Sequence, residues 1–367
     1  MQDNPFEYRL LAKGDRFVDR ESELDTIIKT VKSGQNITIY SPRRYGKSSL
    51  ILESFERLKK DRVVVYIDFN RINNISELAD SIVSEVVKNA FSSFEKGFSL
   101  IKDALKSLRP TFTPVDDGHV MISLKIVETE KDLEKALRFP QTLAEKKDIR
   151  IVIAMDEFQR ISTLNGGRLE RLFRSVIQEQ DRVTYIFSGS QVNMLKEIFE
   201  DGDRPFFRST KIMKLGRIPK KPFIEYIIKN FENCGVKIDR DIIDEILRLT
   251  DGHPMRTKEL CFELWNREMS KDPTHSLEDV LHILIDNDMY LEQTWNMIKS
   301  SVHRRALEAI AHDHKPYSYE TIEKYGLKGN SHVQRALKTL EHQGILYENE
   351  IVDPFLREWI KRKTGSR

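Results

Sequence analysis

The stretch from residue 41 to residue 49 constrains this chain more than any other. It reads Ser-Pro-Arg-Arg-Tyr-Gly-Lys-Ser-Ser and lies between an apolar run at residues 37–40 and a helix-like run at residues 50–58. The end of this stretch matches the phosphate-binding loop, whose pattern is glycine, four residues of any kind, then Gly-Lys-Ser/Thr. Ser41 stands where that pattern has its first glycine, so the fit departs at one position. A strand, such a loop and a helix in that order predict an α/β fold that binds a nucleotide.

The residue types in this loop suit a triphosphate. Backbone N–H groups in a tight loop, followed by a helix N-terminus, converge on phosphate oxygens. Gly46 lets the backbone curl without a Cβ, Lys47 is expected to reach the β- and γ-phosphates, and the Ser48 hydroxyl to ligate Mg²⁺. The alternative is a basic turn that opens a helix. The predicted nucleotide-binding residues of the loop are Ser41, Pro42, Arg43, Arg44, Tyr45, Gly46, Lys47, Ser48 and Ser49.

Composition sets the broad class of the protein. The chain has 367 residues, enough for two or three domains, with 39% apolar and 32% charged residues. A net charge of +2 does not by itself indicate a polyanion partner. No apolar run is long enough to cross a membrane, and the N-terminus lacks the pattern of a signal peptide. With two cysteines only, Cys234 and Cys261, we expect reduced thiols and a cytoplasmic protein.

Strand-like runs recur along the first 216 residues. After residues 37–40, they occupy residues 63–67, 151–155, 183–187 and 212–215, with helix-like runs between most of them. Near-continuous apolar strands that alternate with helices predict a parallel five-stranded sheet covered on both faces. Ligands of such sheets bind at the carboxyl ends of the strands, where Asp156 and Ser188 are expected.

Asp156 and Glu157 form a second motif at the end of the run at residues 151–155. Asp156 is expected to hold the Mg²⁺ shell, and Glu157 to orient and polarise the attacking water. The alternative is that the two acids favour the N-terminus of the next helix. Together with the loop, the pair predicts hydrolysis of the bound nucleotide.

The rest of the chain predicts two further domains and an insertion. Residues 88–130 contain a turn signal at residues 116–118 and a strand-like run at residues 120–126, which suggest an inserted hairpin. The pattern from residue 219 to about 297 is helical without strands. Three short helices then precede two short strands around residues 348–350, the order of a winged helix-turn-helix. The predicted domains are a P-loop ATPase core at residues 1–217, an all-α lid at 218–298 and a winged helix at 299–367.

These motifs, in this order, resemble the archaeal-type ATPase family of the signal-transduction ATPases with numerous domains, within the AAA+-like P-loop group. The resemblance covers nearly the whole chain. Besides the loop, it rests on Arg-Phe-Val-Asp-Arg-Glu at residues 16–21, Asp-Glu-Phe-Gln at 156–159, Gly-His-Pro at 252–254 and Asp-Pro-Phe at 353–355. It implies an ATPase core, a helical lid and a winged helix. It also implies that the nucleotide is ATP. The sequence itself lacks the Asn-Lys-x-Asp motif that recognises guanine.

The resemblance implies roles for four more residues. Arg208, which follows an aromatic pair, corresponds to an arginine that acts on the γ-phosphate of a neighbouring subunit or in cis. Pro254 corresponds to a lid proline that touches the nucleotide, Arg256 to a second sensor, and Ser190 lies near the sensor after the fourth core strand. Each has a simpler alternative: Arg208 can pair with a surface acid, for example.

The winged helix raises the question of DNA binding. Its recognition helix, residues 331–343, carries His332, Gln334, Arg335 and Lys338, which are types that contact bases or phosphates. The wing tip carries Glu348 and Glu350, which disfavour a polyanion. The alternative is a winged helix that packs on the lid and core or docks a protein.

The sequence thus predicts an ATP-binding, Mg²⁺-dependent ATPase that acts as a nucleotide-driven conformational switch, with Glu157, Lys47 and Arg208 as catalytic residues. One alternative is an ATP-regulated DNA-binding protein similar to archaeal replication initiators. Another is a nucleotide-gated scaffold with little hydrolysis. Expected partners are ATP, a protein docked on the lid or winged helix, and further copies of the chain in a nucleotide-dependent oligomer, with no membrane.

Overall fold

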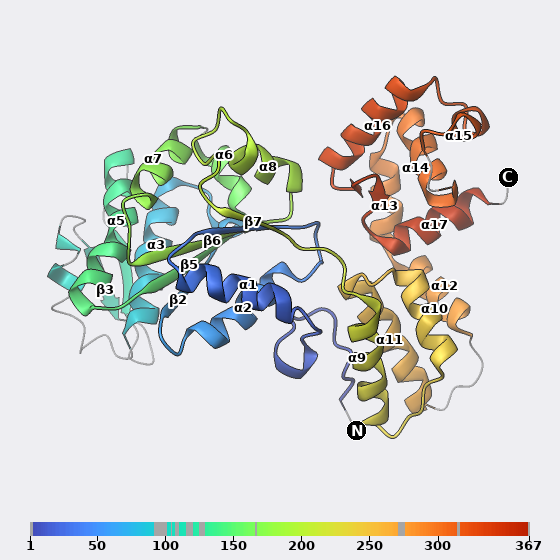
Figure 1. Cartoon of the computed structure of the whole chain (residues 1–367), viewed down its shortest axis with the longest axis horizontal. Coiled ribbons are helices and arrows are strands. Elements are labelled where there is room, and N and C mark those ends of the chain that lie inside the picture. Colours follow the sequence, from blue (N-terminus) through green and yellow to red (C-terminus); the bar gives the residue numbers. More distant parts are fainter. Residues whose placement is uncertain are drawn as a thin grey trace. The chain divides into compact units, whose positions relative to one another are not determined.

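The chain divides into two compact units. The first, here called the sheet unit, comprises Glu21–Ser41 and Leu50–Leu215, and the second, the lid unit, comprises Met1–Arg20, Pro42–Ser49 and Gly216–Arg367 (Figure 1). The predicted domain limits remain a prediction. The computed structural model describes residues 3–91, 101–103, 105–106, 110–114, 120–124, 129–165, 167–270, 276–313 and 316–365.

A parallel five-stranded sheet forms the centre of the sheet unit, as predicted. Its strand order is β2-β5-β6-β1-β7, and every neighbouring pair is parallel. Each strand lies within one or two residues of its predicted position. The strands are β1 (Ile37–Tyr40), β2 (Val63–Asp68), β5 (Ile151–Asp156), β6 (Val183–Gly189) and β7 (Lys211–Lys214).

The position of each strand in the sheet explains its sequence. The inner strands β1, β5 and β6 are buried along their whole lengths, because both of their faces are covered. The edge strands differ: β2 alternates between buried and half-buried residues, and β7 is buried only at Met213. In the register, Met155 of β5 lies beside Phe187 of β6. The residues that follow these two strands therefore emerge at the same edge.

Helices flank the sheet. An ion pair between Arg57 and Glu21 joins α2 to α1, and α3 packs on α5, which in turn packs on α7. Phe158, in the short 3-10 turn after β5, contacts the rings of Phe69, Phe173, Phe187, Phe199 and Phe206. The helices are α1 (Glu21–Lys32), α2 (Lys47–Leu58), α3 (Ile75–Ala90), α5 (Glu130–Lys147), α6 (Ile161–Asn165), α7 (Gly167–Ile177) and α8 (Val192–Glu200), with 3-10 turns η2 (Phe69–Arg71) and η5 (Phe158–Arg160).

The predicted inserted hairpin is confirmed in its described part. Strands β3 (Pro110–Pro114) and β4 (Val120–Leu124) pair antiparallel, and β4 contacts α3. The predicted turn at residues 116–118 and the last two residues of the predicted strand, 125 and 126, lie outside the described residues. α3 continues to Ala90, past the predicted start of the insertion at residue 88.

The lid unit has one continuous hydrophobic core that includes Phe6 of the N-terminal segment, whose ring lies 5.0 Å from that of Phe231. Between residues 219 and 297, the described residues form helices and no strand, as predicted. Its helices are α9 (Lys220–Glu232), α10 (Arg240–Thr250), α11 (Pro254–Ser270), α12 (Leu277–Asn287), α13 (Met289–Met297), α14 (Ser301–Asp313), α15 (Tyr319–Lys324), α16 (Asn330–His342) and α17 (Pro354–Thr364), with the 3-10 turn η1 (Gly14–Arg16) near the N-terminus.

The predicted winged helix is present. After α14, α15 and α16, the strands β8 (Leu346–Tyr347) and β9 (Glu350–Ile351) form a short antiparallel wing. Glu348 and Asn349 form its two-residue tip, with φ of 52° and 63°, a geometry that suits a tight hairpin turn. Glu350, expected at the tip, is instead the first residue of β9.

Two smaller expectations concern thiols and membranes. Cys261 is buried in α11, whereas Cys234 lies half-buried just after α9, and both are free thiols. Across the described residues, the helices are too short or too polar to span a lipid bilayer.

The turn between α10 and α11 depends on a glycine. Gly252 has a φ of 66°, and a Cβ on it would lie 2.4 Å from the carbonyl oxygen of Ile218. In return, the amide of Ile218 donates to the carbonyl of Gly252 at 3.1 Å. This close approach joins the turn between α10 and α11 to the segment that precedes α9.

Gly252→Ala is expected to destabilise the chain by about 2–4 kcal/mol, because a left-handed backbone and a steric clash act together. Urea denaturation of the variant and the wild type measures the loss. Gly235→Ala is the matched control, since Gly235 also has a positive φ, 74°, but a Cβ there would meet no described atom within 4 Å. Equal losses in the two variants would contradict the role of the Ile218 contact.

Candidate functional site

The loop from Pro42 to Gly46 links β1 to α2 and curls back on itself. Arg44 and Gly46 have φ of 67° and 88°, and α2 begins at Lys47. The Lys47 ammonium donates to the carbonyl of Pro42 at 3.2 Å and is nearly buried. The first turn of α2 contains no acidic residue. The loop therefore combines a lysine, a left-handed glycine and a helix N-terminus, which is the arrangement that binds anions.

Tyr45 fixes the loop to the rest of the lid unit. Its side chain is buried and packs edge-on against the ring of His253, with centroids 5.1 Å apart. Its hydroxyl accepts from Nε of Arg217 at 3.3 Å, and its carbonyl accepts from Arg20 at 3.4 Å. Burial raises the pKa of Tyr45, so its hydroxyl stays protonated at neutral pH. Tyr45, at a position that the motif leaves unspecified, thus anchors the loop.

The other loop residues differ in exposure. Arg43 and Arg44 are exposed, and the Arg44 guanidinium lies 5.4 Å from the ring centroid of Tyr290 at the start of α13. The Ser49 hydroxyl accepts from the amide of Ala12 at 3.0 Å. Ser48 is half-buried, and Ser41 and Pro42 are buried. The assignment of these residues to nucleotide binding remains a prediction.

In the sheet unit, Asp156 ends β5 and is held by hydrogen bonds. Its Oδ1 accepts from the hydroxyl of Ser188 at 2.6 Å and from the amide of Glu157 at 3.0 Å. Its Oδ2 accepts from the hydroxyl of Tyr66 on the neighbouring strand β2. The side chain is 5% exposed. The prediction that Asp156 and Ser188 lie at the same edge of the sheet is confirmed by the hydrogen bond between them. The contact from Tyr66 was not predicted, because a tyrosine inside a strand has no sequence pattern that indicates a site.

Glu157 follows in a left-handed conformation, with φ of 55°. Its Oε2 accepts hydrogen bonds from Gln159 and from both the amide and the hydroxyl of Ser190. Its side chain makes no capping hydrogen bond to the turn η5 that follows. The carboxylate is therefore held by residues beyond the strand ends and does not serve as a helix cap.

Arg208 lies in an anchored loop of the sheet unit. The buried ring of Phe206 precedes it in the aromatic cluster, and Arg204 pairs with the fully buried carboxylate of Glu170 at 2.6 Å. Arg208 itself has a φ of 52°, is exposed, and places its guanidinium 5.1 Å from the ring centroid of Phe207. Among the described residues, no carboxylate forms an ion pair with it, and the alternative of a surface ion pair stays untested. A role on the γ-phosphate remains a prediction.

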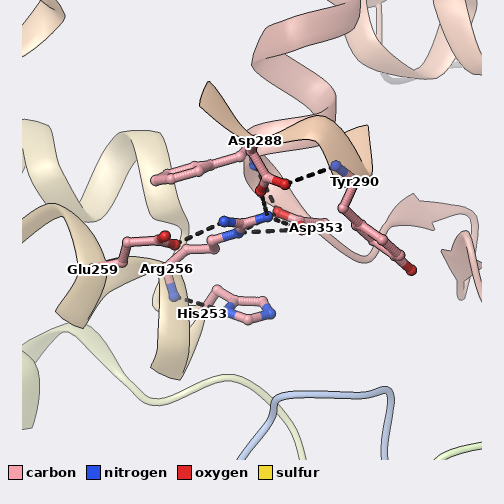
Figure 2. A network of polar contacts seen from close by, with 7 residues as sticks. His253, Arg256, Glu259, Asp288, Tyr290 and Asp353 are labelled. Carbon is pink, nitrogen blue, oxygen red and sulfur yellow. Dashed lines mark hydrogen bonds and ion pairs between the residues drawn. The ribbon is translucent and has the colours of Figure 1, made fainter. Parts of the chain in front are cut away.

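His253 caps the N-terminus of α11. Its Nδ1 accepts from the amide of Arg256 at 3.2 Å, and Pro254 occupies the first helical position, where its missing N–H costs nothing (Figure 2). Accepting this bond requires an unprotonated Nδ1. Burial lowers the pKa of His253 to about 3, which keeps the ring neutral. His253 therefore caps the helix and also contacts Tyr45.

Arg256 is buried and surrounded by three carboxylates, as Figure 2 shows. Its guanidinium donates to Asp353 at 2.6 Å and 2.9 Å, to Asp288 at 2.7 Å and to Glu259 at 2.7 Å. Its side chain is 2% exposed. Burial alone raises the pKa of Asp353, but the adjacent guanidinium outweighs that effect and holds the pKa below its ordinary value. Arg256 thus joins α11 to the residues that precede α13 and α17, and its predicted nucleotide contact remains a prediction.

Arg217 is a further contact residue that sequence reasoning missed. Besides Tyr45, it pairs with Asp251 at the end of α10 and lies 3.5 Å from the carboxylate of Glu350 on the wing. It also donates to the carbonyl of Ile351 at 3.3 Å. One guanidinium therefore contacts the loop, the lid and the wing. Its partners lie up to 172 residues away, and no local spacing signals such a contact.

The buried neutral His253 predicts a dependence of stability on pH. Since its pKa is lower in the folded than in the unfolded chain, its contribution is fully present above about pH 6.5 and is lost as the pH falls toward 3. Asn also caps helices but does not titrate here. We expect the stability of the wild type relative to His253→Asn to fall by about 1.4 kcal/mol between pH 7.5 and pH 5.5. Urea denaturation of the wild type and of His253→Asn at both pH values measures this change. His332→Asn, at an exposed position, is the control and should follow the pH dependence of the wild type. The same change in stability between the two pH values for the wild type and His253→Asn would contradict the prediction.

Comparisons with known proteins agree with this architecture. The model of the ATPase domain predominantly from Archaea matches residues 17–260, and that of a probable winged helix domain matches residues 289–362. An uncharacterized ATP-binding protein of Pyrococcus abyssi is 26% identical over 182 residues, which cover 47% of this chain and 52% of that protein. One from Methanocaldococcus jannaschii is 22% identical over 291 residues, covering 75% and 77%. The match thus spans about half the length of the first relative.

Solved structures share the fold. The Walker-type ATPase of Pyrococcus abyssi superposes with a TM-score of 0.70 at 19% identity, covering 97% of this chain and 99% of that one. The ORC2 protein of Aeropyrum pernix, solved with ADPNP and ADP, superposes with a TM-score of 0.59 at 13% identity, covering 99% and 98%. The chain belongs to the family of ATPase domains found predominantly in Archaea, with a winged helix at its C-terminal end.

Proposed function

We propose that the chain binds ATP at the loop Pro42–Ser49 and hydrolyses it. The observation that carries the proposal is the loop itself, in which a left-handed Gly46 and the Lys47 ammonium lie at the start of α2. A triphosphate can replace the Pro42 carbonyl as the partner of Lys47. Membership of the ATPase family and relatives named as ATP-binding proteins support ATP as the nucleotide.

Mg²⁺ fits the residues proposed to hold it. Ser48 and Asp156 offer a hydroxyl and a carboxylate, the hard oxygen ligands that Mg²⁺ prefers. Among the described residues, no group of three or more His, Cys, Asp or Glu side chains could hold a metal ion. Mg²⁺ bound to nucleotides takes one or two protein ligands and completes its shell with phosphate oxygens and water. When bound, the ion would neutralise charge on the phosphates.

Three residues carry the proposed chemistry. Glu157 accepts a proton from the attacking water and orients it, Lys47 stabilises charge on the phosphates, and Arg208 supplies a further positive charge at the γ-phosphate. Arg208 is exposed, so it is accessible to a neighbouring copy of the chain in a nucleotide-dependent oligomer; the alternative is that it acts in cis.

The proposed switch rests on Tyr45. Because its ring contacts His253 and its hydroxyl contacts Arg217, a rearrangement of the loop on binding or hydrolysis changes the surroundings of both residues. Arg217 in turn contacts the wing at Glu350 and Ile351. The nucleotide state is thereby coupled to the winged helix, where a protein partner can dock.

Two substitutions separate binding from hydrolysis. Lys47→Ala is expected to abolish ATP binding, because it removes the charge at the phosphates, whereas Glu157→Gln should retain binding and lower kcat by about 100-fold or more. Titration with a fluorescent ATP analogue measures binding, and phosphate release measures hydrolysis. Unchanged hydrolysis in Glu157→Gln would reject the assigned base. A wild type that binds ATP without hydrolysing it would favour the nucleotide-gated scaffold instead.

DNA binding is the second candidate, favoured by the exposed face of α16. That face presents His332, Gln334, Arg335 and Lys338, while Val333, Ala336 and Leu337 are buried. The exposed Glu348 and Glu350 of the wing oppose it. A fluorescence titration with duplex DNA at two salt concentrations decides: if DNA binds, affinity falls steeply with salt and Arg335→Ala weakens it. No binding at low salt with or without ATP would reject this candidate.

A further inference from the structure

The two oxygens of the Glu157 carboxylate have different surroundings. Oε2 accepts from Nε2 of Gln159 at 2.5 Å, from Oγ of Ser190 at 2.8 Å and from the amide of Ser190 at 3.3 Å. Within the described part of the chain, no donor reaches Oε1. A carboxylate bound in this way cannot rotate freely, because rotation would break hydrogen bonds to one of its oxygens.

Both donor residues are themselves firmly held. Gln159 is 2% exposed and lies in the turn η5, next to Phe158 in the aromatic cluster. Ser190 follows directly after β6, and one of its two hydrogen bonds to Glu157 comes from its backbone amide, which no rotamer change can remove. The carboxylate is thus attached to two neighbouring strands of one sheet, β5 and β6.

The amide of Gln159 keeps this orientation at a cost. Its Oε1 is buried and has no hydrogen-bond partner among the described residues. It fits only because position 189 is a glycine: a Cβ on Gly189 would lie 2.0 Å from that oxygen. A buried acceptor without a partner is unfavourable, so packing must enforce the conformation that aims Nε2 at Glu157.

We propose that Gln159 and Ser190 are positioning residues that hold Glu157 by Oε2 and so leave Oε1 as the oxygen that faces the attacking water. The inference rests on the proposed function, in which Glu157 is the base. A base must have one lone pair directed at the proton it removes, and its geometry has to be fixed before the reaction. In that step, a proton passes from water to Oε1 as the water oxygen attacks the γ-phosphorus and ADP leaves; Gln159 and Ser190 exchange no proton.

The test uses the full chain and compares Gln159→Met and Ser190→Ala with the wild type in steady-state ATP hydrolysis. Met has nearly the length of Gln but no amide, so it removes the hydrogen bond with little change in volume. We expect kcat to fall about 10- to 100-fold in each variant, since a misplaced catalytic group costs rates of that order. KM for ATP and affinity for a fluorescent ATP analogue should stay within about two-fold, because neither residue is proposed to touch the nucleotide.

Two further variants separate positioning from a general structural role. Gln141→Met is the matched control: Gln141 lies in α5 of the same unit and also donates from Nε2 to a glutamate, Glu145, at 2.7 Å. It should keep the wild-type kcat even if its melting temperature falls. Ser190→Thr retains the hydroxyl and should restore much of the kcat lost in Ser190→Ala.

The outcomes are distinct. Wild-type kcat in both Gln159→Met and Ser190→Ala would overturn the inference, and a raised kcat would show instead that the two residues restrain Glu157 from acting. A higher KM with unchanged kcat would also overturn it, since that would assign the residues to nucleotide binding. If Gln159→Met does not fold, Ser190→Ala and its Thr counterpart decide alone. A wild type without ATPase activity would reject the proposed function itself, and the inference with it.

Discussion

The lid unit depends on one buried charge. The Arg256 guanidinium is taken almost entirely out of water, and a buried charge left unpaired would cost several kcal/mol, about 3–5 when one partner is removed. Three carboxylates therefore have to converge on it, and they come from α11, from the residue before α13 and from the residue before α17. The ring of Phe355 lies 4.4 Å from the same guanidinium. This requirement holds the helical lid and the C-terminal winged helix together in one core.

The phosphate-binding loop belongs to the same set of contacts. His253 caps α11 through the amide of Arg256 and packs on Tyr45 of the loop. Arg217 contacts the hydroxyl of Tyr45 and the wing. Tyr45 occupies a position that the loop motif leaves unspecified. Its buried side chain thus has two fixed neighbours in the lid unit, His253 and Arg217. That arrangement is the physical basis of the proposed coupling between nucleotide and winged helix.

In the sheet unit, the carboxylates of Asp156 and Glu157 are oriented by residues at the ends of neighbouring strands. Parallel strands β5 and β6 end side by side, so residues at or just beyond their ends meet without any long side chain. Ser188 thereby reaches Asp156, and Ser190 reaches Glu157. Each carboxylate is oriented before any ligand binds, which reduces the reorganisation that the proposed chemistry would require.

Much of this protein could be predicted from local sequence. Continuous apolar runs fixed the five strands, and the loop motif, the acids after β5 and the order of short helices and strands near the end indicated an ATPase fold with a winged helix. Such features have short-range causes: periodicity, turn chemistry and strand ends. Only the tertiary structure decided that Arg256 is ion-paired to Asp353, that Tyr45 packs on His253, and that Gln159 and Ser190 share one oxygen of Glu157. Some of those contacts join residues that are distant in the chain, and others depend on the orientation of individual side-chain atoms. The spacing of residues in a sequence motif specifies neither.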